Sequence, residues 1–154
     1  MSMEYIGHFY VAALEVFREL GFDNAGYGEP PVKSVSQGII ANIGLTGDHP
    51  GFLIFKSDIE SASGFVSKML ENLEMEHNEN EFGDFHKEAI GEIVNQVSGR
   101  AAMKLSEIDI NCNITPPTIL TGDNLFFDLR QFTVFTTKSL TAEFGVINIT
   151  VGIK

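Results

Sequence analysis

Residues 85–105 read FHKEAIGEIVNQVSGRAAMKL, and the rest of the chain is organised around this stretch. At roughly 100° of rotation per residue, its apolar side chains fall on one broad face of a helix. These residues are Phe85, Ala89, Ile90, Ile93, Val94, Val97, Ala101 and Leu105. The pattern predicts a long amphipathic helix whose apolar face is buried in the core.

A second set of residues, which we name the polar stripe, lies on nearly the opposite face of this helix. Glu88, Glu92, Asn95 and Gly99 follow one another at intervals of four, three and four residues, so they stack along the helix. Exposed helix faces commonly carry glutamate. Asn, however, is a mediocre helix former, and a mid-helix Gly costs about 1 kcal/mol relative to Ala. Two unfavourable residues on one stripe indicate a surface that receives a partner, with Gly99 allowing close contact.

Length and composition are those of an ordinary globular protein. The 154 residues predict one domain over residues 1–154, and the 44% apolar and 20% charged residues argue against disorder. The 21 acidic and 10 basic residues give a formal net charge of −11. Such a charge repels nucleic acids and anionic membrane surfaces. It favours a partner with a basic rim, which Glu88 and Glu92 could meet.

Cysteine content and hydropathy indicate the compartment. The single cysteine, Cys112, excludes an intramolecular disulfide, suits a reducing cytoplasm and is expected to be buried. No basic-then-apolar leader opens the chain, and no apolar run approaches the ~20 residues that span a bilayer. We therefore expect a cytoplasmic protein without a membrane segment.

The remaining elements predict an α+β fold, with three main helices packed on a mainly antiparallel sheet. Helices are expected at 4–20 and, after a cap at Ser57 or Asp58, up to about residue 73. Strands are expected at 35–43, 52–55, 118–121, 132–137 and 143–152. The first two are expected to form a hairpin, and the strand at 143–152 is a candidate edge strand. Residues 22–34 and 71–81 are expected to be surface connections.

A self-contained active site is not visible in the sequence. Ser98 and Ser106 lack a predicted histidine neighbour, so neither is an activated nucleophile. The four histidines are scattered without metal-ligand spacing, and two exposed carboxylates four residues apart make a weak cation site. His86, near one end of the helix, is better explained by packing or exposure. An amide that completes another protein's active site fits better, because Asn can hold and orient a water molecule.

The polar stripe also resembles a known family. The run Glu88-xxx-Glu92-xx-Asn95-xxx-Gly99, followed by the downstream pair Pro116-Pro117, is similar to the active helix of the CheX/CheC chemotaxis phosphatases, CheX in particular. Glu92 and Asn95 match the Glu-xx-Asn core of the family pattern, whereas Glu88 stands where the family has Asp or Ser. The resemblance extends to the early helix, GIIANIGLTGDHPGFLIF at 38–55 and PPTILTG at 116–122.

This resemblance implies a CheC/CheX-like fold and a response-regulator phosphatase that hydrolyses the phosphoaspartate of a CheY-like receiver domain. Asn95 would orient the attacking water, Glu92 would pair with the receiver lysine, and Glu88 and Gly99 would bind the partner. Mg²⁺ would be supplied by the receiver, and this chain itself would bind no metal or cofactor. Family members pair through their sheets, so a homodimer is implied. The alternative is a catalytically silent, CheX-like receiver-binding module or dimeric scaffold.

Overall fold

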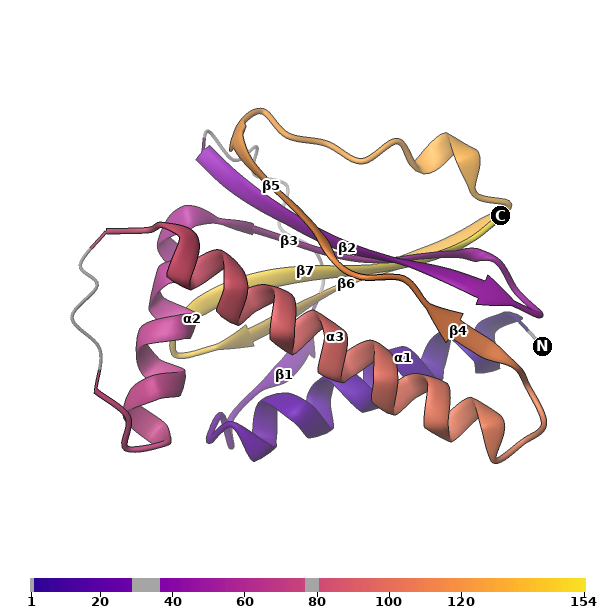
Figure 1. The fold of residues 1–154 in the computed structure, drawn as a ribbon, viewed down its shortest axis with the longest axis horizontal. Helices are drawn as coiled ribbons and strands as arrows, with labels where there is room; N and C mark the ends of the chain where they lie inside the picture. The colour runs from indigo at the N-terminus through magenta and orange to yellow at the C-terminus, as the bar shows by residue number, and fades with distance from the viewer. Residues whose placement is uncertain (1, 29–36, 77–80) are drawn as a thin grey trace.

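One antiparallel sheet with three helices on one face makes up the fold (Figure 1). The computed structural model describes residues 2–28, 37–76 and 81–154. The helices described are α1 (Ser2–Glu19), α2 (Ile59–Asn72) and α3 (Asp84–Ser106), with a 3-10 helix η1 (Leu129–Gln131). The strands described are β1 (Gly26–Gly28), β2 (Gln37–Gly47), β3 (Gly51–Asp58), β4 (Cys112–Ile114), β5 (Thr118–Asp123), β6 (Val134–Ala142) and β7 (Gly145–Ile153).

The described strands follow the order β1-β6-β7-β3-β2-β4, and β5 pairs with β2 beside β4. Each of these pairings is antiparallel. The predicted fold class, helices packed on a mainly antiparallel sheet, is therefore confirmed. The hairpin between β2 and β3 is also as predicted, although β2 is longer than expected.

Helix boundaries follow from local sequence signals. Gly21 adopts a φ of 97° directly after α1, a left-handed conformation that glycine tolerates best. The Asp58 carboxylate accepts a hydrogen bond from the Ser61 amide at 2.6 Å, which caps α2 as expected. Each signal supplies a partner or a permitted conformation at a helix end.

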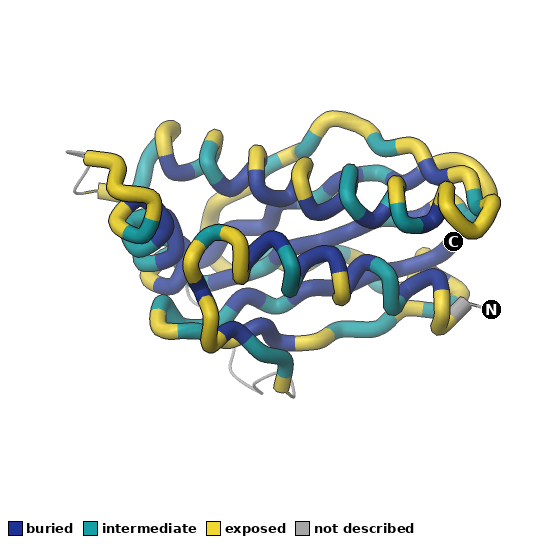
Figure 2. Tube along the Cα trace, turned by 90° about the horizontal axis from the view of Figure 1, so that it is seen from below, coloured by how far each residue is buried: buried dark blue, intermediate teal, exposed yellow. Residues whose placement is uncertain are grey.

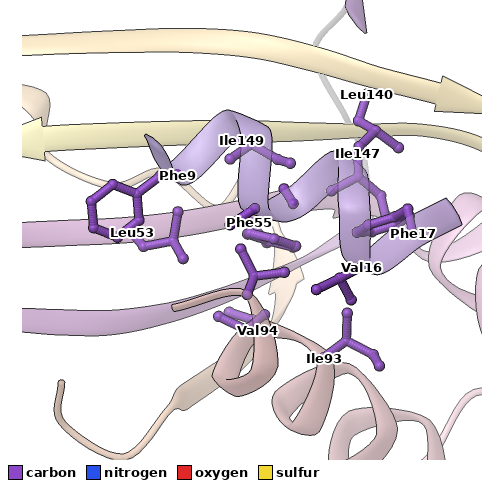
Figure 3. Close-up of a cluster of buried hydrophobic side chains, with 14 of the residues drawn as sticks. Phe9, Val16, Phe17, Leu53, Phe55, Ile93, Val94, Leu140, Ile147 and Ile149 are labelled. Carbon is purple, nitrogen blue, oxygen red and sulfur yellow. The ribbon is translucent and has the colours of Figure 1, made fainter. Parts of the chain in front are cut away.

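The core lies between the helices and one face of the sheet. Alternate residues of β2, β3 and β7 point towards the helices and are buried among the side chains of all three. Figure 3 shows Ile93 and Val94 directed from α3 into this layer, opposite Val16 of α1. In Figure 2, α1 and α3 lie side by side, with buried and exposed stretches alternating along each.

The opposite face of the sheet carries a smaller apolar cluster. Ile40, Ile54 and Phe132 are buried there, and Phe52, Leu125, Phe127 and Leu129 pack against them. The connection between β5 and β6 supplies most of these side chains and crosses this face (Figure 1).

Three details differ from the sequence-based expectation. β7 is an interior strand between β6 and β3, so its prediction as an edge strand is wrong. Its residues are largely buried on both faces, which is typical of an interior strand. Strand β1 was not predicted within 22–34. Phe85, assigned to the apolar face of α3, is 39% exposed, and the next residue, His86, takes the buried position in the first turn of the helix. The expected connections at 29–36 and 77–80 lie outside the described residues.

Candidate active site on helix α3

A buried histidine fixes the start of α3. The Gly83 amide donates a hydrogen bond to His86 Nδ1 at 3.2 Å, and the His86 ring stacks on Phe82 with centroids 5.1 Å apart. The histidine thus supplies an acceptor for a backbone amide at the helix start and fills the core position that Phe85 leaves. Of the two roles considered for His86, packing is the one observed.

A glycine on the buried side brings the diproline segment against the helix. A Cβ atom at Gly91 would lie 3.0 Å from Ile119 Cδ1 and 3.6 Å from Pro117 Cγ. Because Gly91 has no side chain, the start of β5 packs directly on the turn of α3 that carries Glu92. Gly91 was not among the predicted site residues, although a glycine in mid-helix marks such a position in the sequence.

Ion pairs join the other side of α3 to α1. Arg100 forms a bidentate pair with Glu19, with one contact of 2.8 Å, and also approaches Glu15 at 3.6 Å. Lys104 Nζ donates to Glu15 at 3.1 Å. Hydrogen bonding from the Arg100 guanidinium lowers the pKa of Glu19. Arg100 is therefore engaged within its own chain.

The polar stripe projects from this supported helix. Glu88, Glu92 and Asn95 are exposed, and Gly99 is half-buried. The side chains of Glu88, Glu92 and Asn95 make no hydrogen bond or ion pair with the described part of the chain. A Cβ atom at Gly99 would meet nothing within 4 Å. The four residues thus lie together on one accessible face, as the periodicity predicted, with two uncompensated carboxylates beside an unpartnered amide.

Neither of two hollows formed by the described residues is lined by the polar stripe. One is a cavity of about 20 Å³ with mainly apolar walls that include Phe17 and Phe65. An open hollow between β5 and the segment before α3 is lined by Ile59, Phe82 and residues 121–123, without a stripe residue. Among the described residues, no group of three or more His, Cys, Asp or Glu could hold a metal ion. No described helix is long and apolar enough to cross a membrane.

Sequence comparison identifies the family to which this arrangement belongs. A family model described as "Chemotaxis phosphatase CheX" matches residues 39–137, which include α3 and the diproline segment. The chain belongs to the CheX family. A curated relative, "CheY-P phosphatase CheX" from Thermotoga maritima, is 34% identical over 101 residues. That match spans 64% of this CheX-family chain and 63% of the relative's length.

Solved structures share the fold over nearly the whole chain. A complex of CheX with CheY, BeF₃ and Mg²⁺ from Borrelia burgdorferi matches with a TM-score of 0.77 and 26% identity, covering 97% of each chain. The chemotaxis protein CheX from Vibrio vulnificus matches with a TM-score of 0.78 and 17% identity, covering 98% of this chain and 97% of the other. The predicted family is confirmed. The individual roles of Glu88, Glu92, Asn95 and Gly99 stay predictions.

Proposed function

We propose that this chain is a phosphatase that hydrolyses the phosphoaspartate of a CheY-like receiver domain. Family membership, the named activity of the Thermotoga relative and the CheX–CheY complex from Borrelia support this function. The observation that carries it is the unpartnered Asn95 amide, exposed beside Glu92 on a helix packed on two sides. An amide without an internal partner is available to a water molecule in another protein's site.

Asn95 performs the chemical role in this proposal. Its side chain accepts and donates hydrogen bonds without carrying charge, so it can hold a water in line with the acyl phosphate. The water oxygen forms a bond to phosphorus as the bond between phosphorus and the aspartyl oxygen breaks. The products are the free aspartate carboxylate and inorganic phosphate, which takes up the oxygen and both protons of the water. Mg²⁺ held by the receiver offsets the phosphoryl charge.

The other stripe residues position the receiver. Glu92 lies about 4.5 Å from Asn95 along the helix axis and pairs with the receiver's active-site lysine. Glu88, one turn further, supplies a second carboxylate for docking. Gly99 lets the partner's backbone approach the helix. This arrangement needs no metal on the phosphatase side, and the single cysteine is consistent with a cytoplasmic reaction.

The homodimer is also part of the proposal. Leu120 and Phe135 are 53% and 45% exposed, and Phe126 lies in the connection that crosses the outer face of the sheet. Leu120 pairs with Ile40, and the Phe135 ring contacts Phe132, so both belong to the face of the sheet that carries the smaller apolar cluster. Large exposed apolar side chains on one face of a sheet favour a protein contact. Sedimentation of the purified chain tests this part, and a monomer at micromolar concentration would rule it out.

The test of the catalytic role compares two neighbouring amides. Asn95→Ala should slow dephosphorylation of a phosphorylated receiver about 100-fold, because the water loses its orientation. Gln96→Ala, at an exposed position beside the polar stripe, is the matched control and should retain activity. Both variants should melt near the wild type, since exposed substitutions change stability little.

Three results separate the candidate functions. Acceleration by the wild type that Asn95→Ala removes supports the phosphatase. Binding to a beryllofluoride-treated receiver without acceleration identifies the silent docking module instead. Unfolding of Asn95→Ala would make the amide structural and refute the proposed role.

A further inference from the structure

The exposed face of α3 continues beyond Gly99 and changes its chemistry there. Met103 follows Gly99 by four residues and therefore stacks on the same stripe, one turn further along. Its side chain is 69% exposed, so it is not a core residue. Its neighbours Lys104 and Arg100 are both paired with acids of α1. An apolar side chain thus stands in solvent on a well-supported part of the helix.

The two halves of this face suit different partner groups. Towards the start of α3 it presents Glu88 and Glu92, which have no cationic partner in the described part of the chain. Towards the end it presents Gly99 and Met103, with the half-buried Ala102 beside them. A basic group complements the first half, and an apolar surface complements the second. One partner that covers α3 would need both.

We propose that Met103 is a docking residue that contacts an apolar patch on the phosphorylated receiver, an inference that rests on the proposed function. Asn95 must reach the phosphoaspartate, which fixes the partner's position along the helix. Glu92 then lies about 4.5 Å to one side and Met103 about 12 Å to the other. The receiver therefore presents its lysine and its apolar patch on opposite sides of the phosphoaspartate. The flexible thioether of Met103 adapts to such a patch.

Met103→Gln tests this docking role because Gln has a similar length and helix propensity. The variant should raise the KM for the phosphorylated receiver about tenfold and leave kcat unchanged, since the contact is remote from the reacting atoms. Met103→Leu keeps an apolar side chain and should restore a KM near that of the wild type. Unchanged melting and circular dichroism would show that the fold is intact.

Met75→Gln is the matched control. Met75 is 56% exposed and lies three residues after the end of α2. That end of α2 and the last turns of α3 lie at opposite ends of the molecule (Figure 1). The same substitution there should leave KM unaltered. An effect at Met75 equal to that at Met103 would point to general hydrophobic attraction and overturn the inference.

Other outcomes also decide the question. The docking role would be overturned if Met103→Gln left KM unchanged or lowered kcat alone. It would also be overturned if the variant changed the sedimentation coefficient with a normal KM, because Met103 would then contact a second copy of the chain. If the wild type hydrolyses nothing, the proposed function fails separately. Met103→Gln is then judged by its affinity for the beryllofluoride-treated receiver, which should fall about tenfold.

Discussion

The substitution Gly99→Ala tests whether the glycine at this position is required for contact with a partner or for the stability of the fold. In a helix interior this substitution should stabilise the protein by about 1 kcal/mol. No neighbour opposes the gain, because the added methyl group would meet nothing within 4 Å. For a domain of this size, the melting temperature should rise by roughly 2–4 °C. At a close interface the same methyl group should weaken docking by about 1–3 kcal/mol, by analogy with an overpacked core.

Thermal melting and steady-state dephosphorylation of a phosphorylated receiver measure the two effects in one preparation. We expect Gly99→Ala to melt higher while its KM rises at least about fivefold. Gly7→Ala is the control, because Gly7 is also helical, in α1, and its added Cβ would likewise meet nothing within 4 Å. It should raise the melting temperature and leave KM unchanged. A Gly99→Ala variant with normal KM, or one that melts lower, would refute the reasoning.

Two further predictions concern the support of α3. Arg100→Gln should return the pKa of Glu19 to the ordinary carboxylate range, as followed by NMR titration, because the guanidinium hydrogen bond holds that pKa down. A lowered carboxylate pKa stabilises the folded state at neutral pH, and this stabilisation is lost as pH falls through the folded-state pKa. The stability of Arg100→Gln should therefore depend less on pH in that range. A Glu19 pKa that is the same in the variant and the wild type would contradict the pairing. Leu105→Ala, at a fully buried position in the last turn of α3, should reduce the free energy of unfolding by about 2–5 kcal/mol in urea titrations. A loss below about 1 kcal/mol would show that the core does not depend on this residue.

The sequence predicted α3 and its polar stripe well because helical periodicity is a local property. Apolar residues recur over nearly the whole helix, so the exposed position of Glu92 and Asn95 follows from their spacing. The pattern failed at Phe85, which is exposed in the first turn of α3. There the polar His86 is buried instead, where it accepts a backbone hydrogen bond that hydropathy cannot reveal.

Features that depend on distant residues were not predictable in this way. The neighbour that favours a glycine at position 91 is Ile119 of β5, whose Cδ1 would lie 3.0 Å from an added Cβ atom. The place of β7 depends on which strands pair with it, and alternation along one strand does not contain that information. Strand β1 has three residues and no hydrophobic pattern, although the Tyr27 hydroxyl donates to the Tyr10 carbonyl oxygen at 2.6 Å.

The interior position of β7 has a consequence for how the protein matures. β7 follows the other described strands along the chain, yet it joins the pair β1 and β6 to the strands that begin with β3. Until it emerges from the ribosome, β3 lacks a neighbour on one side and the apolar layer beneath α1 is incomplete. A nascent chain should therefore need residues 145–153 outside the ribosome before α1, against which the helix that carries Asn95 packs, gains its complete supporting surface. A chaperone has most to protect during that interval.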